Sequence, residues 1–142
     1  MIILDTNVIS EVMAVQPSRA VAAWMDATPT FDLATTTINI AEIRYGLARL
    51  PFGRRRARLG ARFESILARA FGTRVFAFDG LAAATYGKLV AARERGGRPL
   101  EGPDGFIAAI AASRGSPIAT RDTRDFEGCG IAVINPWNTG MA

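Results

Sequence analysis

The chain has 142 residues, which is enough for one ordinary domain spanning residues 1–142 and too few for two. Hydrophobic residues make up 49% and charged residues 21%, the profile of a globular protein. The single cysteine, Cys129, excludes an internal disulfide framework, and the lack of histidine excludes His-ligated zinc, catalytic triads that use histidine and any imidazole general base. Any chemistry must therefore use carboxylates, hydroxyls, arginine or a hard metal ion.

The formal net charge is +4, and the basic residues are nearly all arginine because Lys88 is the only lysine. The planar guanidinium group suits phosphates and carboxylates, although an arginine-rich chain equally reflects a GC-rich genome. Residues 1–5 have neither a basic flank nor a long apolar core, so we expect no signal peptide. No stretch approaches the ~20 apolar residues that a membrane span requires. These features predict a cytoplasmic protein.

The first predicted element is a short apolar strand over residues 2–4. Residues 5–7 (Asp-Thr-Asn) follow it, and side chains of these types cap helices. Two short helices are predicted within residues 8–27, because Pro17 ends the first and Ser18 can cap the second.

The rest of the chain alternates strands and helices. In chain order the predicted elements are a weak strand (31–34), an amphipathic helix (38–50), a second amphipathic helix with a basic start (54–71), a strand (75–78), a helix capped by Asp79 that runs to Gly96, a helix that Asp104 opens and Gly115 follows, and two strands (117–120 and 131–134). This alternation is typical of a parallel sheet with helices on both faces. The fold class predicted is therefore α/β.

Acidic side chains lie where several predicted strands or loops end. Asp5 ends the first strand, Asp104 opens a helix, and Asp122 follows the strand at 117–120. Glu42 lies in the first turns of the helix after the second strand, away from the apolar stripe of that helix. Ligands of parallel sheets bind outside the carboxyl ends of the strands, so these four carboxylates can converge on one site.

Four converging carboxylates would repel one another unless a cation lay between them. Oxygen ligands of this charge suit Mg²⁺ or Mn²⁺. The same repulsion predicts that the metal-free protein gains stability when one acid is replaced by its neutral isostere, as in Asp5→Asn.

Each acid also has a purely structural interpretation. Asp5 fits a simple helix cap, and Asp104 fits a cap stabilised by the helix dipole. Asp122 and Asp125 both fit turn residues, and the sequence leaves open which of the two is the fourth acid. Glu42 alone is uninformative, since glutamate is common on solvated helix faces.

Four sequence blocks occur in a fixed order: ILDTNVIS at 3–10, AEIRYG at 41–46, DGFIAA at 104–109, and ATRD at 119–122 with DF at 125–126. Together they resemble the PIN domain, specifically the VapC/FitB-type toxins of bacterial toxin–antitoxin modules. The closing NPW at 135–137 is similar to the FitB branch. The resemblance covers essentially the whole chain.

The resemblance implies a three-layer α/β/α fold with a central parallel sheet, and a Mg²⁺- or Mn²⁺-dependent endoribonuclease that hydrolyses RNA phosphodiester bonds. The family's four acids match Asp5, Glu42, Asp104 and Asp122. Asp5 and Asp104 would be the direct metal ligands. An antitoxin partner and a homodimer are also implied. The candidates for contacts to the RNA backbone are Arg44, Arg121 and the arginines at 54–62. The run at 54–62 also fits a solvated helix face.

One alternative belongs to a different functional class: a catalytically idle RNA- or protein-binding module on the same fold. The presence of all four acids argues against it.

Two other enzyme classes are excluded because the chain lacks a motif that each of them requires. A haloacid-dehalogenase-type phosphatase requires an aspartate two residues after Asp5, where Asn7 stands, and a receiver domain requires a late lysine, whereas Lys88 lies in the middle of a helix.

Overall fold

The computed structural model of the chain describes residues 1–138. Five parallel strands form one sheet in the order β3-β2-β1-β4-β5. The strands are β1 (Ile2–Leu4), β2 (Leu33–Thr36), β3 (Val75–Phe76), β4 (Ile118–Ala119) and β5 (Val133–Ile134). In the register of the sheet, Ile3 lies between Ala34 of β2 and Ile118 of β4, so β1 is the central strand.

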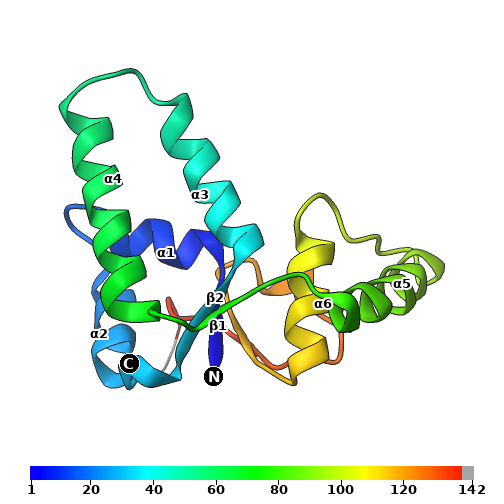
Figure 1. Cartoon of the computed structure of the whole chain (residues 1–142). Helices are drawn as coiled ribbons and strands as arrows, with labels where there is room; N and C mark the ends of the chain where they lie inside the picture. The colour runs from blue at the N-terminus through cyan, green and yellow to red at the C-terminus, as the bar shows by residue number, and fades with distance from the viewer. Residues whose placement is uncertain (139–142) are drawn as a thin grey trace.

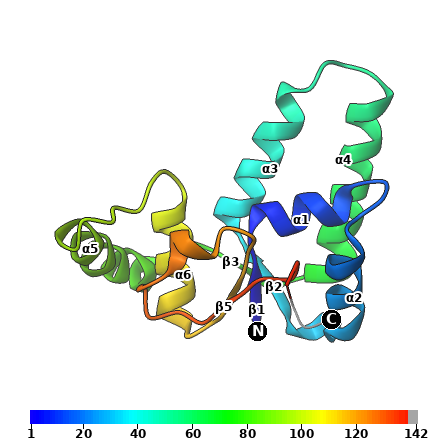
Figure 2. The same ribbon diagram turned by 180° about the vertical axis from the view of Figure 1, so that it is seen from behind.

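Six α-helices and three shorter helical turns surround the sheet within the described residues. They are α1 (Thr6–Met13), α2 (Arg19–Ala27), the 3-10 turn η1 (Thr30–Asp32), α3 (Thr37–Arg49), α4 (Arg54–Ile66), the π-helical turn η2 (Leu67–Phe71), α5 (Gly80–Arg95), α6 (Asp104–Arg114) and the 3-10 turn η3 (Thr123–Phe126). Figure 1 shows α3 and α4 as an antiparallel pair that projects from the sheet, with α5 and α6 on the other side of the molecule. The view from behind in Figure 2 shows the same arrangement.

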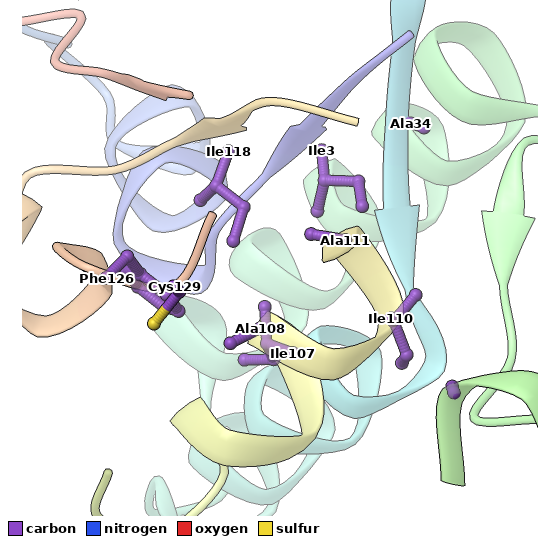
Figure 3. Packing of buried hydrophobic residues seen from close by; sticks show 10 residues of the cluster. Ile3, Ala34, Ile107, Ala108, Ile110, Ala111, Ile118, Phe126 and Cys129 are labelled. Carbon is purple, nitrogen blue, oxygen red and sulfur yellow. The ribbon is translucent and has the colours of Figure 1, made fainter. Parts of the chain in front are cut away.

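Alternate residues of the central strands face opposite helical layers. Ile3 and Ile118 pack against α6, where they meet buried residues such as Ile107, and Figure 3 shows this cluster at close range. Leu4 belongs to a second buried cluster on the other face, together with Phe63 of α4. Because successive side chains of a strand point to opposite faces, both faces of the sheet are buried. The predicted three-layer α/β/α fold is confirmed.

Several helix ends lie where the sequence predicts them. The hydroxyl of Ser18 accepts a hydrogen bond from the backbone N–H of Val21 (3.5 Å) at the start of α2. The carboxylate of Asp79 accepts one from Ala82 (2.9 Å) at the start of α5. Gly115 ends α6 with a φ of 64°, a left-handed conformation that favours glycine.

The last three strands are shorter than predicted, and two other elements differ from prediction for a clear local reason. The second strand is Leu33–Thr36 and not 31–34, because Pro29 starts the η1 turn, in which its carbonyl accepts a hydrogen bond from the N–H of Asp32 (2.9 Å). The helix predicted over 54–71 is α-helical only to Ile66, after which η2 follows with π-helical hydrogen bonding.

The strand order places a binding position beside β1. The chain passes from β1 outward to β2 and β3, and later returns to form β4 on the other side of β1. Ligands of parallel sheets bind at the carboxyl ends of the two strands where the order reverses in this way. The residues just beyond these two strand ends are Asp5 and Thr120.

Within residues 1–138, no helix combines the length and apolar character needed to cross a bilayer.

Candidate functional site

A cleft of about 520 Å³, here called the acidic cleft, opens at the carboxyl ends of β1 and β4. All four acids singled out in the sequence line it: Asp5, Glu42, Asp104 and Asp122. They come from four different segments, namely the end of β1, the first turns of α3, the first residue of α6, and the turn after β4. The fold therefore brings together carboxylates that are up to 117 residues apart in the chain.

Asp5 is almost fully buried, with 5% of its surface exposed. Its Oδ1 accepts hydrogen bonds from the N–H of Thr6 (2.8 Å) and the side-chain amide of Asn39 (3.0 Å), and its Oδ2 accepts one from the hydroxyl of Thr120 (2.8 Å). Burial raises the pKa of Asp5, and these three hydrogen bonds oppose part of that effect because they favour the charged form. Asp5 thus caps α1, and it also lines the acidic cleft.

The two residues after Asp5 hold two of the other acids. The hydroxyl of Thr6 donates a hydrogen bond to Oε1 of Glu42 (2.7 Å). The side-chain amide of Asn7 donates one to Oδ2 of Asp122 (3.1 Å). The first turn of α1 therefore fixes the positions of carboxylates that come from α3 and from the turn after β4.

Asp104 differs from the other three acids because no hydrogen bond among residues 1–138 uses its carboxylate. It is half-buried at the first position of α6, and the N-cap residue is Pro103. Asp104 is therefore not the N-cap of α6, although its position in the first turn does suit the helix dipole. Burial raises its pKa from 3.8 to about 7, helped by the negative charges of Asp5, Asp125, Glu42 and Asp122, in decreasing order.

Asp122 and Asp125 lie on different sides of Asp104. Asp122 lines the acidic cleft together with Asp5. Asp125 instead lines a separate pocket of about 260 Å³, whose other walls include Arg93 and which Asp104 also borders. The geometry therefore favours Asp122 over Asp125 as the fourth acid of the cleft.

The model of the PIN domain family matches residues 2–129. This chain belongs to the PIN domain family. It is 44% identical over 137 residues to "VapC ribonuclease Y4jK" of Sinorhizobium fredii, covering 96% of this chain and 98% of the relative. It is 38% identical over 138 residues to "Toxin FitB" of Neisseria gonorrhoeae, covering 97% and 99%. Among solved structures, FitAcB from Neisseria gonorrhoeae matches with a TM-score of 0.90 and 40% identity, covering 97% of this chain and 99% of the other.

Within residues 1–138 of this PIN domain, no three acidic or cysteine side chains are grouped closely enough to hold a metal ion. The chemistry of the cleft nevertheless fits a hard cation. The carboxylate of Asp104 makes no hydrogen bond among the described residues, and a nearby cation would relieve the repulsion that raises its pKa. Mg²⁺ binds through as few as one or two carboxylates and keeps several waters. The chemistry of the residues that line the cleft therefore fits Mg²⁺ or Mn²⁺.

The sequence analysis missed the uncharged residues that hold the acids in place. Asn39 is fully buried and donates hydrogen bonds both to Asp5 and to the hydroxyl of Thr6 (3.0 Å each). Thr120 is also fully buried and donates to Asp5. The available signal for Asn39 is its position between two isoleucines at the start of α3, where an unpaired amide would be costly to bury.

The arginines proposed from the sequence have different surroundings in this PIN domain. Arg121 lines the acidic cleft, and its guanidinium lies 4.9 Å from the centre of the Trp137 ring. Arg44 forms an ion pair with Glu64 (2.8 Å). Arg62 donates hydrogen bonds to three carbonyls at the carboxyl end of α1. Arg62 therefore caps a helix, and Arg121 is free to face a ligand in the cleft.

The pKa of Asp104 predicts how stability depends on pH in the metal-free protein. A carboxyl group with a raised pKa binds more protons in the folded state, so the free energy of unfolding falls as pH rises from about 4 to about 7. Asp104→Asn should remove this fall in the free energy of unfolding. In EDTA we expect the variant to exceed the wild type at pH 8 by on the order of 1 kcal/mol, or a few degrees of melting temperature, since water partly screens a half-exposed group. At pH 4 the two should melt together.

Asp5→Asn is the matched control, because it removes one charge from the same cleft. The structure changes the expectation drawn from the sequence. The two carboxylate oxygens of Asp5 accept hydrogen bonds from Asn39, Thr6 and Thr120, whereas the amide of an asparagine has only one oxygen that can accept. We expect Asp5→Asn to give no net gain at pH 8. A stability difference between Asp104→Asn and the wild type that is the same at pH 4 and pH 8 would contradict the raised pKa.

Proposed function

We propose that this PIN domain is the toxin of a type II toxin–antitoxin module and acts as a Mg²⁺- or Mn²⁺-dependent endoribonuclease. The observation that carries the proposal is the convergence of four acids on one cleft at the carboxyl ends of β1 and β4, with the Asp104 carboxylate making no hydrogen bond within residues 1–138. Two relatives support the proposal, since one is a VapC ribonuclease and the other is the toxin FitB.

In the proposed reaction Asp5 and Asp104 would hold the cation. A cation bound there would neutralise charge on the scissile phosphate and lower the pKa of an attacking water. Glu42, oriented by Thr6, and Asp122, oriented by Asn7, are the carboxylates that position or deprotonate that water. A carboxylate must take this role because the chain has no histidine.

Arg121 supplies positive charge at a cleft that is also lined by five carboxylates, namely the four acids singled out in the sequence and Glu11. Its backbone N–H donates a hydrogen bond to Oδ1 of Asn7 (3.1 Å), and the ring of Trp137 lies beside its guanidinium. These contacts limit the motion of Arg121, so less conformational entropy is lost when it meets an RNA phosphate. We include Arg121 in the substrate-binding surface.

The proposal includes a restraining partner. A ribonuclease in the cytoplasm acts on its own host's RNA, so unrestrained activity would be harmful. By resemblance to the VapC/FitB toxins the partner is an antitoxin, and the toxin itself is a homodimer. The competing function, an idle RNA- or protein-binding module, has no specific observation in its favour.

We predict that the purified protein cleaves RNA in Mg²⁺ or Mn²⁺ and that EDTA removes the activity. Asp104→Asn should lower the rate by at least roughly a hundredfold, because it removes a proposed ligand of the cation that would neutralise the developing charge. Asp122→Asn should also lower the rate strongly, whereas Asp125→Asn should retain most of it, since Asp125 lies outside the acidic cleft.

Cleavage of a labelled RNA, followed by gel electrophoresis on protein freed of host nucleases, measures these rates. Full activity of Asp104→Asn, or no activity of the wild type with either metal, would overturn the proposed reaction. A stronger loss in Asp125→Asn than in Asp122→Asn would reassign the fourth acid.

We also predict that inducing this gene alone arrests bacterial growth, and that co-expression of the adjacent small antitoxin gene restores it. Asp104→Asn serves as the control, because it should be harmless at an equal level of protein. Growth curves and immunoblots of the induced strains provide the measurement. Unimpaired growth with abundant wild-type protein, in a close relative of the source organism, would contradict the role as a toxin.

A further inference from the structure

We propose that Arg93, near the end of α5, is a positioning residue of the acidic cleft. Its guanidinium ties the loop that leads into Asp104 to the turn that follows Asp122, and so sets the spacing of these two acids. The inference rests on the proposed function, in which both acids serve the same reaction. Arg93 does not line the acidic cleft itself, so it acts through the backbone of its neighbours.

The guanidinium of Arg93 joins acceptors from two segments that are far apart in the chain. Its Nε donates a hydrogen bond to the carbonyl of Arg98 (2.6 Å). Its Nη1 donates to the carbonyls of Asp125 (3.2 Å) and Glu127 (2.7 Å) and to Sγ of Cys129 (3.1 Å). Arginine suits this role because its planar group carries five N–H donors in a fixed fork.

The first of the two segments leads into Asp104. Arg93 holds both backbone groups of Arg98, since its own carbonyl also accepts a hydrogen bond from the Arg98 N–H (2.9 Å). At the other end of the same loop, the N–H of Asp104 donates to the carbonyl of Glu101 (3.2 Å). Arg93 and Asp104 also border the same pocket of about 260 Å³. A shift of this loop would therefore move the first residue of α6.

The second segment follows Asp122, and Figure 2 shows it (orange) beside α6. The N–H of Asp125 donates to the carbonyl of Asp122 (3.1 Å), while the carbonyl of Asp125 accepts from Arg93. Phe126 is fully buried and anchors η3 in the core. Beyond it, residues 127–132 form neither helix nor strand. Arg93 thus holds the backbone on both sides of the one side chain that anchors this turn.

The two tied segments carry charges that repel each other. The negative charge of Asp122 is among those that raise the pKa of Asp104, so electrostatic repulsion tends to separate the segments. Arg93 resists this separation through hydrogen bonds to carbonyls and a sulfur, and none of its hydrogen bonds goes to an acid of the cleft. Without Arg93 the cleft would keep all its acids at a looser spacing.

Isothermal titration calorimetry with Mn²⁺ and no RNA tests the proposal. Arg93→Ala should weaken Mn²⁺ binding about tenfold, as is usual when a group that orients metal ligands is lost. Alanine favours helix, so α5 should persist. Arg93→Lys keeps the charge but not the planar fork, and should recover only part of the affinity. The matched control is Arg95→Ala, which removes an exposed arginine of the same helix and should stay within about twofold.

Steady-state cleavage of RNA at saturating Mn²⁺ gives a second readout. Arg93→Ala should lower kcat about tenfold while KM stays within about twofold, because Arg93 lies outside the acidic cleft. Guanidinium chloride at about 20 mM, far below the concentrations that unfold proteins, should restore part of kcat in Arg93→Ala. Sodium chloride at the same concentration should not. A rise in KM alone would make Arg93 a substrate-binding residue and overturn the proposal.

A variant with lowered stability separates positioning from general destabilisation. Val21 is fully buried in the cluster on the other face of the sheet and does not line the acidic cleft. Val21→Ala should lower the melting temperature because it leaves a cavity, yet it should bind Mn²⁺ as the wild type does. An equal loss of Mn²⁺ affinity in Val21→Ala and Arg93→Ala would show that Arg93 acts on stability alone, which overturns the proposal.

The two proposals fail separately. If the wild type binds Mn²⁺ but cleaves no RNA, the ribonuclease proposal fails, while the Mn²⁺ affinity of Arg93→Ala still decides on the role of Arg93. If the wild type cleaves RNA and Arg93→Ala matches Arg95→Ala in both Mn²⁺ affinity and kcat, the positioning role alone is wrong. If the wild type neither binds Mn²⁺ nor cleaves RNA, both proposals are wrong.

Discussion

The buried carboxylate of Asp5 organises the rest of the site. A charged group with 5% exposure at the end of the central strand is costly unless hydrogen bonds compensate it, and donors from α1, α3 and the end of β4 do so. The same donors connect to the other acids, since Thr6 holds Glu42 and the neighbouring Asn7 holds Asp122. One buried charge therefore fixes where two helices and the ends of two strands present their polar groups.

Asp104 is the residue at which this arrangement of acids lowers the stability of the metal-free protein. Burial, helped by the negative charges of four other carboxylates, raises its pKa to about 7, and its carboxylate gains no hydrogen bond among the described residues in return. Such a group lowers the stability of the metal-free protein at neutral pH. Sites that trade stability for activity in this way are common in enzymes, and a bound cation would reverse the penalty. Stability and the proposed function therefore oppose each other at one side chain.

Much of the architecture could be predicted from the sequence, because apolar strands, Pro17, Ser18, Asp79 and Gly115 are strong local signals. Asp5, Asp104 and Asp122 were found because each follows a strand or opens a helix, whereas Glu42 stood out mainly because its sequence block matches the family. The second strand was misplaced by two residues because the η1 turn takes up Phe31 and Asp32. The hydrogen bonds of Asn39 and the division of the arginines into structural and free ones depend on contacts between distant segments, which local patterns do not encode.

The central claim is that Asp5 and Asp104 bind a divalent cation, and thermal melting in EDTA and in excess Mn²⁺ tests it most directly. A ligand that binds only the folded protein raises the melting temperature, by on the order of 8 °C at a concentration 100 times its dissociation constant. We expect this gain in the wild type and in Asp125→Asn, and its near loss in Asp104→Asn and Asp5→Asn. An equal gain in all four proteins would contradict the account, because Mn²⁺ would then bind elsewhere.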